Sequence, residues 1–448
     1  MAEEKGLTRR EFISKSAAGA AALSMGSLGG IAPSRVLGAN DRICIGVIGV
    51  GGMGSHHFRG LVNRAKDPKW KLEVVAACDV WDVRAQRCVD YSGGRAKRFR
   101  YYQEMLQMPD LDAVVIATPD HWHAKISIDA LEAGKDVYCE KPMTLYWEQA
   151  KAVAECARRT GRVFQCGVQS TSDDRWWQAR RLIEQGALGK LIWSQTGAFR
   201  NDPHGDWNWP IQPAQPGVDL DWDMWLGHEF GLAPKRPYDP ERYSRFRKFW
   251  DYSGGLATDL LYHSYGHLAI ALGPEFPVRV VASGGNYVHT LANDNREVPD
   301  TFHTYIELPS GHTVALFATQ ENNTGVPELI RGQEATMEPG GPGLIIRPEG
   351  PFEGKMMEKV KAGLFEGCEV ITSKDRPGRT VLQEIRVPMQ SRPGHMDKFL
   401  ECVRNHDPKT HLDADTAYRV MVGIALSVKA YREQRVMLFD PEKEELIG

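Results

Sequence analysis

The strongest constraint on the fold is a regular alternation of short apolar runs with helical patterns in the first third of the chain. The runs, each flanked by turn residues, cover 43–50, 72–80, 111–119, 135–140 and 162–168. The helical patterns between them lie near 53–64, 82–91, 121–133 and 146–160. Apolar strands that alternate with helices form parallel sheets buried on both faces. The sequence therefore predicts an α/β, doubly wound parallel sheet of the Rossmann type over residues 41–165.

After about residue 165 the pattern changes. The predicted elements are a helix near 173–186, a strand near 190–199, a Trp/Pro-rich loop at 201–222, a helix near 254–272, and strands beginning near 278, 301 and 312. This order predicts a second α/β domain, 166–448, with helices on one face of a large, open, mostly antiparallel sheet. The Gly/Pro-rich segment 337–355 is predicted to be a surface loop.

Composition excludes several classes of protein. The chain has 448 residues, 42% of them hydrophobic and 25% charged, which is enough for two globular domains. The formal net charge of −3 gives no reason to expect a nucleic acid or an anionic membrane as partner. Four of the eight cysteines, Cys44, Cys78, Cys139 and Cys166, lie in apolar runs, and no Cys-x-x-Cys pair occurs. We expect buried thiols rather than a disulfide framework or a zinc ribbon.

Residues 7–32 have the layout of an export signal. Arg9 and Arg10 are adjacent, Phe12 and Lys15 follow, and a weakly apolar run rich in Ala and Gly comes next. This layout is typical of a twin-arginine signal, and the run is too short and too weakly apolar to span a bilayer stably. The sequence predicts a signal segment at 1–39, recognised by the twin-arginine export machinery, and a periplasmic or otherwise exported protein.

A glycine-rich motif joins the first apolar run to the first helical pattern. Gly49, Gly51 and Gly54 fill the pattern G-x-G-x-x-G, with Gly52 and Met53 inside it. The three glycines allow a tight turn, close approach of the backbone to a pyrophosphate, and close helix-to-strand packing. Asp79 ends the second run, where its carboxylate would bind ribose hydroxyls and repel a 2′-phosphate. These residues predict a dinucleotide site in which NAD is favoured over NADP.

Further polar residues follow two of the apolar runs. Thr118, Pro119, His121 and His123 come after one run, and Glu140 and Lys141 after the next. Ligands of doubly wound sheets bind at the carboxyl edges of the strands. We therefore expect all six residues to contribute to the cofactor site, with Lys141 positioned to meet whatever lies beside the nicotinamide.

The predicted helix over 253–273 carries a polar stripe on an otherwise apolar segment. Asp259, His263 and His267 fall at i, i+4 and i+8. The stripe allows three interpretations. The first is a metal site, although no Glu follows the first His as it does in zincins. The second is a buried network of hydrogen-bonded side chains. The third is a general base, His263, whose tautomer is fixed by Asp259.

Together, the Gly49 motif, the Thr118-Pro119 turn with His123, Glu140-Lys141-Pro142, and the Gly254-Gly255 helix resemble the Gfo/Idh/MocA oxidoreductase family. The resemblance covers nearly all of the chain after the signal segment. It implies a Rossmann domain, a C-terminal domain whose open sheet forms homo-oligomers (a dimer or tetramer), and a site between the domains. It also implies that Lys141, Asp259 and His263 are the catalytic set. The chain departs from the family at Gly266-His267, where an acidic residue is common.

The chemistry expected from these residues is hydride transfer from a secondary alcohol of a sugar, glycoside or cyclitol. His263 would remove the hydroxyl proton, Lys141 would stabilise the alkoxide, and Asp259 would orient His263. Tyr262, His267 and Arg200 are the candidate substrate contacts, and no metal is expected. The loop 201–210 mixes aromatic and polar residues, as sugar-binding surfaces often do.

Export adds a requirement, because reduced cofactor cannot be exchanged outside the cytoplasm. We therefore expect a tightly bound NAD that a second step recycles. Three alternatives stay open. They are an NAD-dependent glycosidase that works by oxidation and elimination on the same fold, a metal-dependent hydrolase, and a sugar-binding protein without catalysis.

Overall fold

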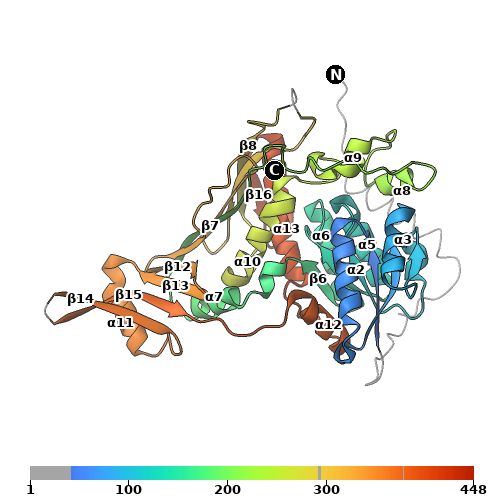
Figure 1. The fold of residues 1–448 in the computed structure, drawn as a ribbon. Coiled ribbons are helices and arrows are strands. Elements are labelled where there is room, and N and C mark those ends of the chain that lie inside the picture. The colour runs from blue at the N-terminus through green and yellow to red at the C-terminus, as the bar shows by residue number, and fades with distance from the viewer. Residues whose placement is uncertain (1–41, 291–293, 377) are drawn as a thin grey trace.

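A computed structural model describes residues 42–290, 294–376 and 378–448 (Figure 1). The predicted signal segment at 1–39 lies outside the described residues. The described part divides into a parallel sheet and a larger mixed sheet, with helices between them (Figure 1). None of the helices in these three ranges is long and apolar enough to cross a membrane.

The N-terminal domain is built on a six-stranded parallel sheet in the order β3-β2-β1-β4-β5-β6, which confirms the predicted fold class. Its strands are β1 (Ile43–Ile48), β2 (Leu72–Cys78), β3 (Lys97–Phe99), β4 (Ala113–Ile116), β5 (Asp136–Glu140) and β6 (Phe164–Gly167). Its helices are α2 (Gly52–Arg64), α3 (Asp82–Tyr91), α4 (Tyr102–Leu106), α5 (Asp120–Glu132) and α6 (Trp147–Thr160), with a short turn η1 (Pro68–Trp70). Strand order reverses between β1 and β4, and that switch point opens a crevice for ligands.

The C-terminal domain contains an eleven-stranded sheet in the order β14-β15-β13-β12-β11-β7-β10-β9-β8-β16-β17, antiparallel except for the β7–β10 pair. Its strands are β7 (Leu191–Phe199), β8 (Arg279–Gly285), β9 (Thr301–Glu307), β10 (Thr313–Thr319), β11 (Leu329–Gly332), β12 (Ala335–Gly340), β13 (Gly343–Pro348), β14 (Glu369–Arg376), β15 (Arg379–Val387), β16 (Met437–Asp440) and β17 (Glu445–Ile447). The predicted open, mostly antiparallel sheet is therefore confirmed.

Three helices lie between this sheet and the N-terminal domain (Figure 1): α7 (Asp174–Glu184), α10 (Tyr262–Leu272) and α13 (Ala414–Glu433). A fourth, α12 (His395–Asn405), packs its apolar side into the N-terminal core with Phe399 and Val403. Short helical pieces occupy the connections: η2 (Gln169–Ser172), α8 (Trp222–Leu226), η3 (His228–Phe230), α9 (Pro240–Ser244) and η4 (Phe246–Lys248). The domains thus share core residues instead of meeting only at a linker.

The prediction of a surface loop at 337–355 is wrong. This segment contains most of the hairpin β12–β13, the turn η6 (Gly350–Phe352) and the start of helix α11 (Glu353–Lys361). Gly341, with φ of +54°, provides the tight hairpin turn, while Leu344 and Ile346 alternate into the core. The Gly and Pro residues that suggested a loop mark only the turn and the strand ends. The eight cysteines are free, as expected, and seven are buried.

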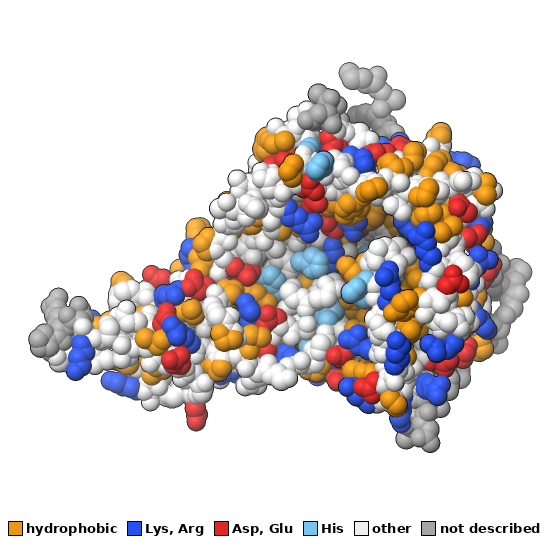
Figure 2. Space-filling view, viewed as in Figure 1, with side chains coloured by type: hydrophobic (Ala, Val, Ile, Leu, Met, Phe, Trp, Pro, Cys, Tyr) orange, Lys and Arg blue, Asp and Glu red, His pale blue; other side chains and the backbone are white. Residues whose placement is uncertain are grey.

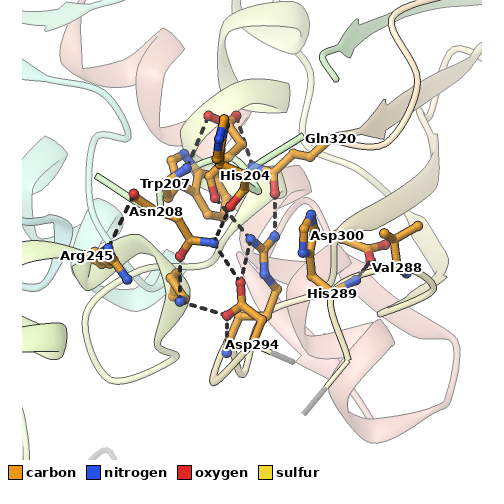
Figure 3. Close-up of polar contacts among 12 residues, drawn as sticks. His204, Trp207, Asn208, Arg245, Val288, His289, Asp294, Asp300 and Gln320 are labelled. Carbon is orange, nitrogen blue, oxygen red and sulfur yellow. Dashed lines mark hydrogen bonds and ion pairs between the residues drawn. The ribbon is translucent and has the colours of Figure 1, made fainter. Parts of the chain in front are cut away.

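A buried polar network fastens the loop that follows β7 to Asp294, Arg296 and Gln320 in the rest of the C-terminal domain (Figure 3). The side chain of Arg296 is fully buried and donates to Gln320 Oε1 at 2.7 Å, to the carbonyl of Asp206 at 3.0 Å and to Asp294 Oδ2 at 3.2 Å. Lys248 bonds Asp294 Oδ1 at 2.7 Å. Since buried charges are tolerated only when they are paired and hydrogen-bonded, this network fixes the loop in one position.

Replacing Arg296 should therefore destabilise the protein strongly. Arg296→Met removes the ion pair of the buried Asp294 carboxylate with Arg296. We expect the free energy of unfolding in urea to fall by about 3–5 kcal/mol. Arg347→Met is the matched control, because Arg347 pairs with Glu338 and Glu384 but is half exposed, and it should cost less than about 1 kcal/mol. Equal losses in the two variants would contradict the structural role of the network.

Candidate active site

The glycine-rich turn has the geometry that a dinucleotide phosphate requires. Gly49 has φ of +79° and donates its N–H to the carbonyl of Cys78 at 2.8 Å. A Cβ on Gly54 would lie 1.9 Å from the carbonyl oxygen of Gly49, whereas one on Gly52 would meet nothing within 4 Å. Gly54 therefore lets α2 pack against β1, and Gly52 leaves the N-terminus of α2 open to an anion.

An elongated cavity of about 780 Å³ runs from this turn along the carboxyl edge of the sheet. Gly49, Gly51, Gly52, Met53 and Asp79 line one end. Thr118 lies directly beside Gly49. Pro119, Glu140 and Lys141 also line the cavity, and the buried hydroxyl of Thr118 has no hydrogen-bond partner in the described part of the chain. Figure 2 shows this face of the molecule hollowed between the two domains, with histidine side chains gathered there. The cavity fits a dinucleotide.

Asp79 occupies the end of the cavity expected for the adenosine ribose. It follows β2, and Oδ1 accepts the N–H of Trp81 at 2.9 Å. Burial raises the pKa of Asp79, although the nearby positive charge of Arg84 acts to lower this pKa. Arg84, Arg87 and Arg100 line the same end of the cavity. The Asp79 carboxyl group therefore lies at an otherwise cationic end of the cavity.

Lys141 and Asp259 join the two domains at the other end. Lys141 Nζ lies 2.6 Å from Asp259 Oδ1 and 2.8 Å from the Asp259 carbonyl oxygen, and each side chain is only 10% exposed. Arg247 Nε bonds the same Oδ1 at 2.8 Å. Although burial alone would raise it, the charges of Arg247 and Lys141 hold the pKa of Asp259 far below its usual value. Asp259 is therefore ionised and shared between two cations.

The expected pairing of Asp259 with His263 is wrong. The helix begins with a π-helical turn, η5 (Ala257–Leu261), before α10, so residues 259 and 263 are not stacked as they would be in a regular α-helix. Within the described ranges, no hydrogen bond connects the two side chains, because the Asp259 carboxylate serves Lys141 and Arg247. Burial and the nearby Lys141 charge lower the pKa of His263 to about 3. His263 is thus neutral, as a general base must be.

His267 belongs to a buried polar network. Its Nε2 lies 2.6 Å from Glu328 Oε1, its Nδ1 lies 3.3 Å from Ser170 Oγ, and its ring stacks on Trp176 at 4.3 Å. Both ring nitrogens therefore have protein partners. Among the residues that the structure describes, no group of three or more His, Cys, Asp or Glu side chains could hold a metal ion. The buried-network interpretation accounts for this part of the stripe.

The three predicted substrate contacts lie away from the cavity. Tyr262 is fully buried and donates its hydroxyl to the carbonyl of Ala417 at 3.0 Å. Arg200 follows β7 and pairs with Asp206 at 3.0 Å. Tyr262 is therefore a core residue, which corrects the expectation for it, whereas substrate contacts at Arg200 and His267 stay predictions. Helical spacing placed Tyr262 and His267 on one element, but contacts with α13 for Tyr262 and with Glu328 and Trp176 for His267 decided where each side chain points.

Two predicted cofactor residues also act from behind the cavity wall. His121 Nε2 lies 3.1 Å from the carbonyl of Trp225, and burial lowers its pKa to about 3. The ring of His123 lies between the carbonyl oxygens of Pro142, at 2.7 Å, and Thr118, at 2.9 Å. His123 therefore holds the two edge turns together through both ring nitrogens. Both histidines are correctly placed near the site, but neither lines the cavity.

Sequence reasoning missed three polar residues of the site: Asp120, Arg247 and His57. Asp120 and Arg247 line the cavity next to Lys141. His57, on α2, bonds Glu140 Oε1 at 2.6 Å, and Gln169 bonds the same oxygen at 3.1 Å. Burial opposes the shift, but the hydrogen bond from His57 lowers the pKa of Glu140. The sequence contained a usable signal for His57 only, since it lies one helical turn beyond the glycine motif.

Two family models match the chain. One, described as an oxidoreductase family with an NAD-binding Rossmann fold, matches residues 43–168, and its companion C-terminal alpha/beta domain matches residues 232–438. The scyllo-inositol 2-dehydrogenase (NAD(+)) of Bacillus subtilis is 28% identical over 381 residues, which are 85% of this chain and 91% of that protein.

Other matches are shorter or more distant. The inositol 2-dehydrogenase of Salmonella typhimurium is 32% identical over 148 residues, 33% of this chain, so the match spans less than half (43%) of that relative. The structure of an aldose-aldose oxidoreductase from Caulobacter crescentus shares the fold, with a TM-score of 0.59 and 17% identity over 89% of this chain and 100% of that one.

The position of Asp79 generates a prediction about cofactor choice. In Asp79→Ser the repulsion of a 2′-phosphate is lost while Arg84 remains, so the affinity for NADP relative to NAD should rise about tenfold or more. Dissociation constants for both nucleotides, from quenching of protein fluorescence, provide the measurement. Asp90→Ser, on the exposed side of α3, is the matched control and should leave the ratio unchanged. An unchanged ratio in Asp79→Ser would remove Asp79 from the ribose site.

Proposed function

Because the chain belongs to the Gfo/Idh/MocA oxidoreductase family, we propose that it is an NAD-dependent enzyme that oxidises a secondary hydroxyl of a sugar, glycoside or cyclitol. The observation that carries the proposal is the buried Lys141–Asp259 pair at the carboxyl edge of the Rossmann sheet. Relatives named inositol dehydrogenases support the substrate class.

Each catalytic side chain has a role that its surroundings allow. NAD, when bound, supplies a hydride acceptor. Burial and the charge of Lys141 keep His263 neutral before the reaction, and the neutral imidazole takes the hydroxyl proton of the substrate. Lys141 stabilises the developing alkoxide. Asp259 fixes the ammonium group of Lys141 through two contacts and so acts on Lys141 instead of on His263.

Export and cofactor recycling complete the proposal. The adjacent Arg9 and Arg10, followed by a weakly apolar run, support passage through the twin-arginine route. Outside the cytoplasm the cofactor must stay bound and be reset by reduction of a second substrate. The intact Lys141–Asp259 pair favours this oxidoreductase over a sugar-binding protein without catalysis.

We also propose a homo-oligomer, a dimer or tetramer, formed through the outer face of the C-terminal sheet. Trp193 on β7 and Tyr305 on β9 are each 43% exposed, and the Tyr305 ring contacts Phe317 on β10. Exposed aromatic residues on an open sheet are typical of contact surfaces. Light scattering of wild type and of Trp193→Asp tests this surface, and a monomeric wild type would contradict it.

Purification without added nucleotide tests the recycled cofactor. We expect denaturation of the exported protein to release NAD or NADH in nearly one-to-one amount, identified by mass spectrometry. Paired sugars should then react without net change in the bound cofactor. A control preparation of Gly54→Val, whose side chain would displace the glycine turn, should be empty. An empty wild type would contradict the trapped cofactor.

The pH dependence of oxidation should reflect the lowered pKa of His263. Since this pKa is about 3, His263 stays neutral as the pH falls from 8 to 5, and kcat/KM should show no loss near the ordinary histidine value. Activity that depends on His263 should decline only as the pH approaches its lowered pKa. His263→Gln should lower kcat by about 100-fold or more. A wild-type acid limb near pH 6.5 that is absent in His263→Gln would contradict this assignment.

A further inference from the structure

Arg247 lies where the cavity meets the second domain. It belongs to η4 and lines the cavity close to Lys141 and Asp120. Its Nε is committed to Asp259 Oδ1 at 2.8 Å, so one edge of the planar guanidinium is fixed. The side chain is still 23% exposed. One part of the group therefore stays accessible from the cavity.

That accessible part consists of the two terminal nitrogens. Within 42–290, 294–376 and 378–448, neither Nη1 nor Nη2 of Arg247 has a hydrogen-bond or ion-pair partner, and neither belongs to the fully enclosed unsatisfied atoms. A guanidinium presents five N–H donors in a rigid fork, four of them on these two nitrogens. Donors at the wall of a cavity need acceptors, and two adjacent oxygen atoms match the fork.

Aromatic rings fix the orientation of the guanidinium. Its carbon lies 4.6 Å from the centre of the Phe246 ring and 5.4 Å from that of Trp209. Trp209 lines the same cavity, and its carbonyl accepts Arg245 Nε at 2.6 Å. Rings that contact a guanidinium stabilise its charge and limit its rotation. Arg247 is thus a preorganised donor.

Lys248 and Asn208, which respectively follow Arg247 and precede Trp209 in the sequence, connect the two segments on the buried side. Lys248 Nζ bonds Asn208 Oδ1 at 2.8 Å, so the turn carrying Arg247 is tied to the loop carrying Trp209. Asn208 Nδ2 also bonds Asp294 Oδ2 at 3.0 Å, and Figure 3 shows these two side chains facing each other. The loop and the turn therefore hold Arg247 and Trp209 at the cavity as one unit.

The charges around Arg247 indicate which acceptors it meets. Lys141 and Arg247 are the cations, and the carboxyl groups of Asp259, Glu140 and Asp120 lie close enough to act on Arg247 electrostatically. Asp259 and Glu140 alone balance both cations. Since no excess positive charge is left to offset the desolvation of an anion, the site suits an uncharged ligand.

We propose that Arg247 is a substrate-binding residue that holds two neighbouring hydroxyl oxygens of an uncharged six-membered sugar or cyclitol ring beside the carbon that is oxidised. The proposal rests on the proposed function for the identity of that carbon. It adds a specificity-determining contact from the C-terminal domain, and it assigns two roles to one side chain. Nε positions Asp259 and Lys141, while Nη1 and Nη2 bind the substrate.

Calorimetric titration of the NADH-loaded protein with myo-inositol, levoglucosan and glucuronate tests the contact without requiring turnover. We expect wild type to bind at least one of the two uncharged rings, and Arg247→Gln to weaken that binding about tenfold or more. Arg247→Lys should fall between them, because lysine is a point donor without the fork. The affinity for NADH should change less than about threefold in either variant. Arg180→Gln, on the surface of α7, is the matched control.

The outcomes separate this proposal from the proposed function. Unchanged ring binding in Arg247→Gln, or binding of no ring by wild type, would overturn the contact. Binding of glucuronate alone, lost in Arg247→Gln, would overturn the uncharged class. Ring binding that depends on Arg247 without any formation of NADH from NAD would sustain the contact and contradict the oxidoreductase. A similar loss of NADH affinity in Arg247→Gln would reassign Arg247 to the cofactor.

Discussion

The site depends on one carboxylate oxygen, Asp259 Oδ1, which accepts Lys141 from the N-terminal domain and Arg247 from the C-terminal domain. Burial of these three charged groups costs desolvation free energy. The two charge-assisted hydrogen bonds, of 2.6 and 2.8 Å, offset that cost only when all three groups are held in the right geometry. The rest of the structure holds the three groups in this geometry. The shared core around α12 fixes the domains, and the network around Lys248 and Arg296 fixes the turn that carries Arg247.

In this arrangement Asp259 and His263 have separate roles, unlike the two members of a hydrogen-bonded Asp–His pair. Asp259 controls Lys141, and His263 is kept neutral by burial and by the charge of Lys141. A neutral imidazole next to a fixed ammonium group can accept a proton while the negative charge of an alkoxide is stabilised. The π-helical turn at 257–261 makes this possible, since it gives Asp259 a direction that a regular helix would not.

The cofactor end of the cavity could be predicted almost completely from the sequence. The turn at Gly49, the packing at Gly54 and the position of Asp79 follow from local chain geometry, and these features lie within one stretch of about 30 residues. The substrate end could be predicted only in part. Lys141, Asp259 and His263 were expected there, but Arg247 comes from the short turn η4 and carried no sequence signal. Tyr262, His267 and Arg200 were also assigned to this end, although their side chains bind other parts of the protein.

The sequence by itself determined the alternation of strands and helices and the open second sheet, because hydrophobic periodicity is a local property, and the resemblance to a known family implied that Lys141, Asp259 and His263 share one site. Tertiary structure alone decided the partners of those residues. Side-chain partners depend on which faces of distant segments meet and on the exact turn of a helix, and a change from α to π geometry reassigns them without any trace in the spacing of the sequence. That is why Asp259 contacts Arg247 and Lys141, and why His267 contacts Glu328.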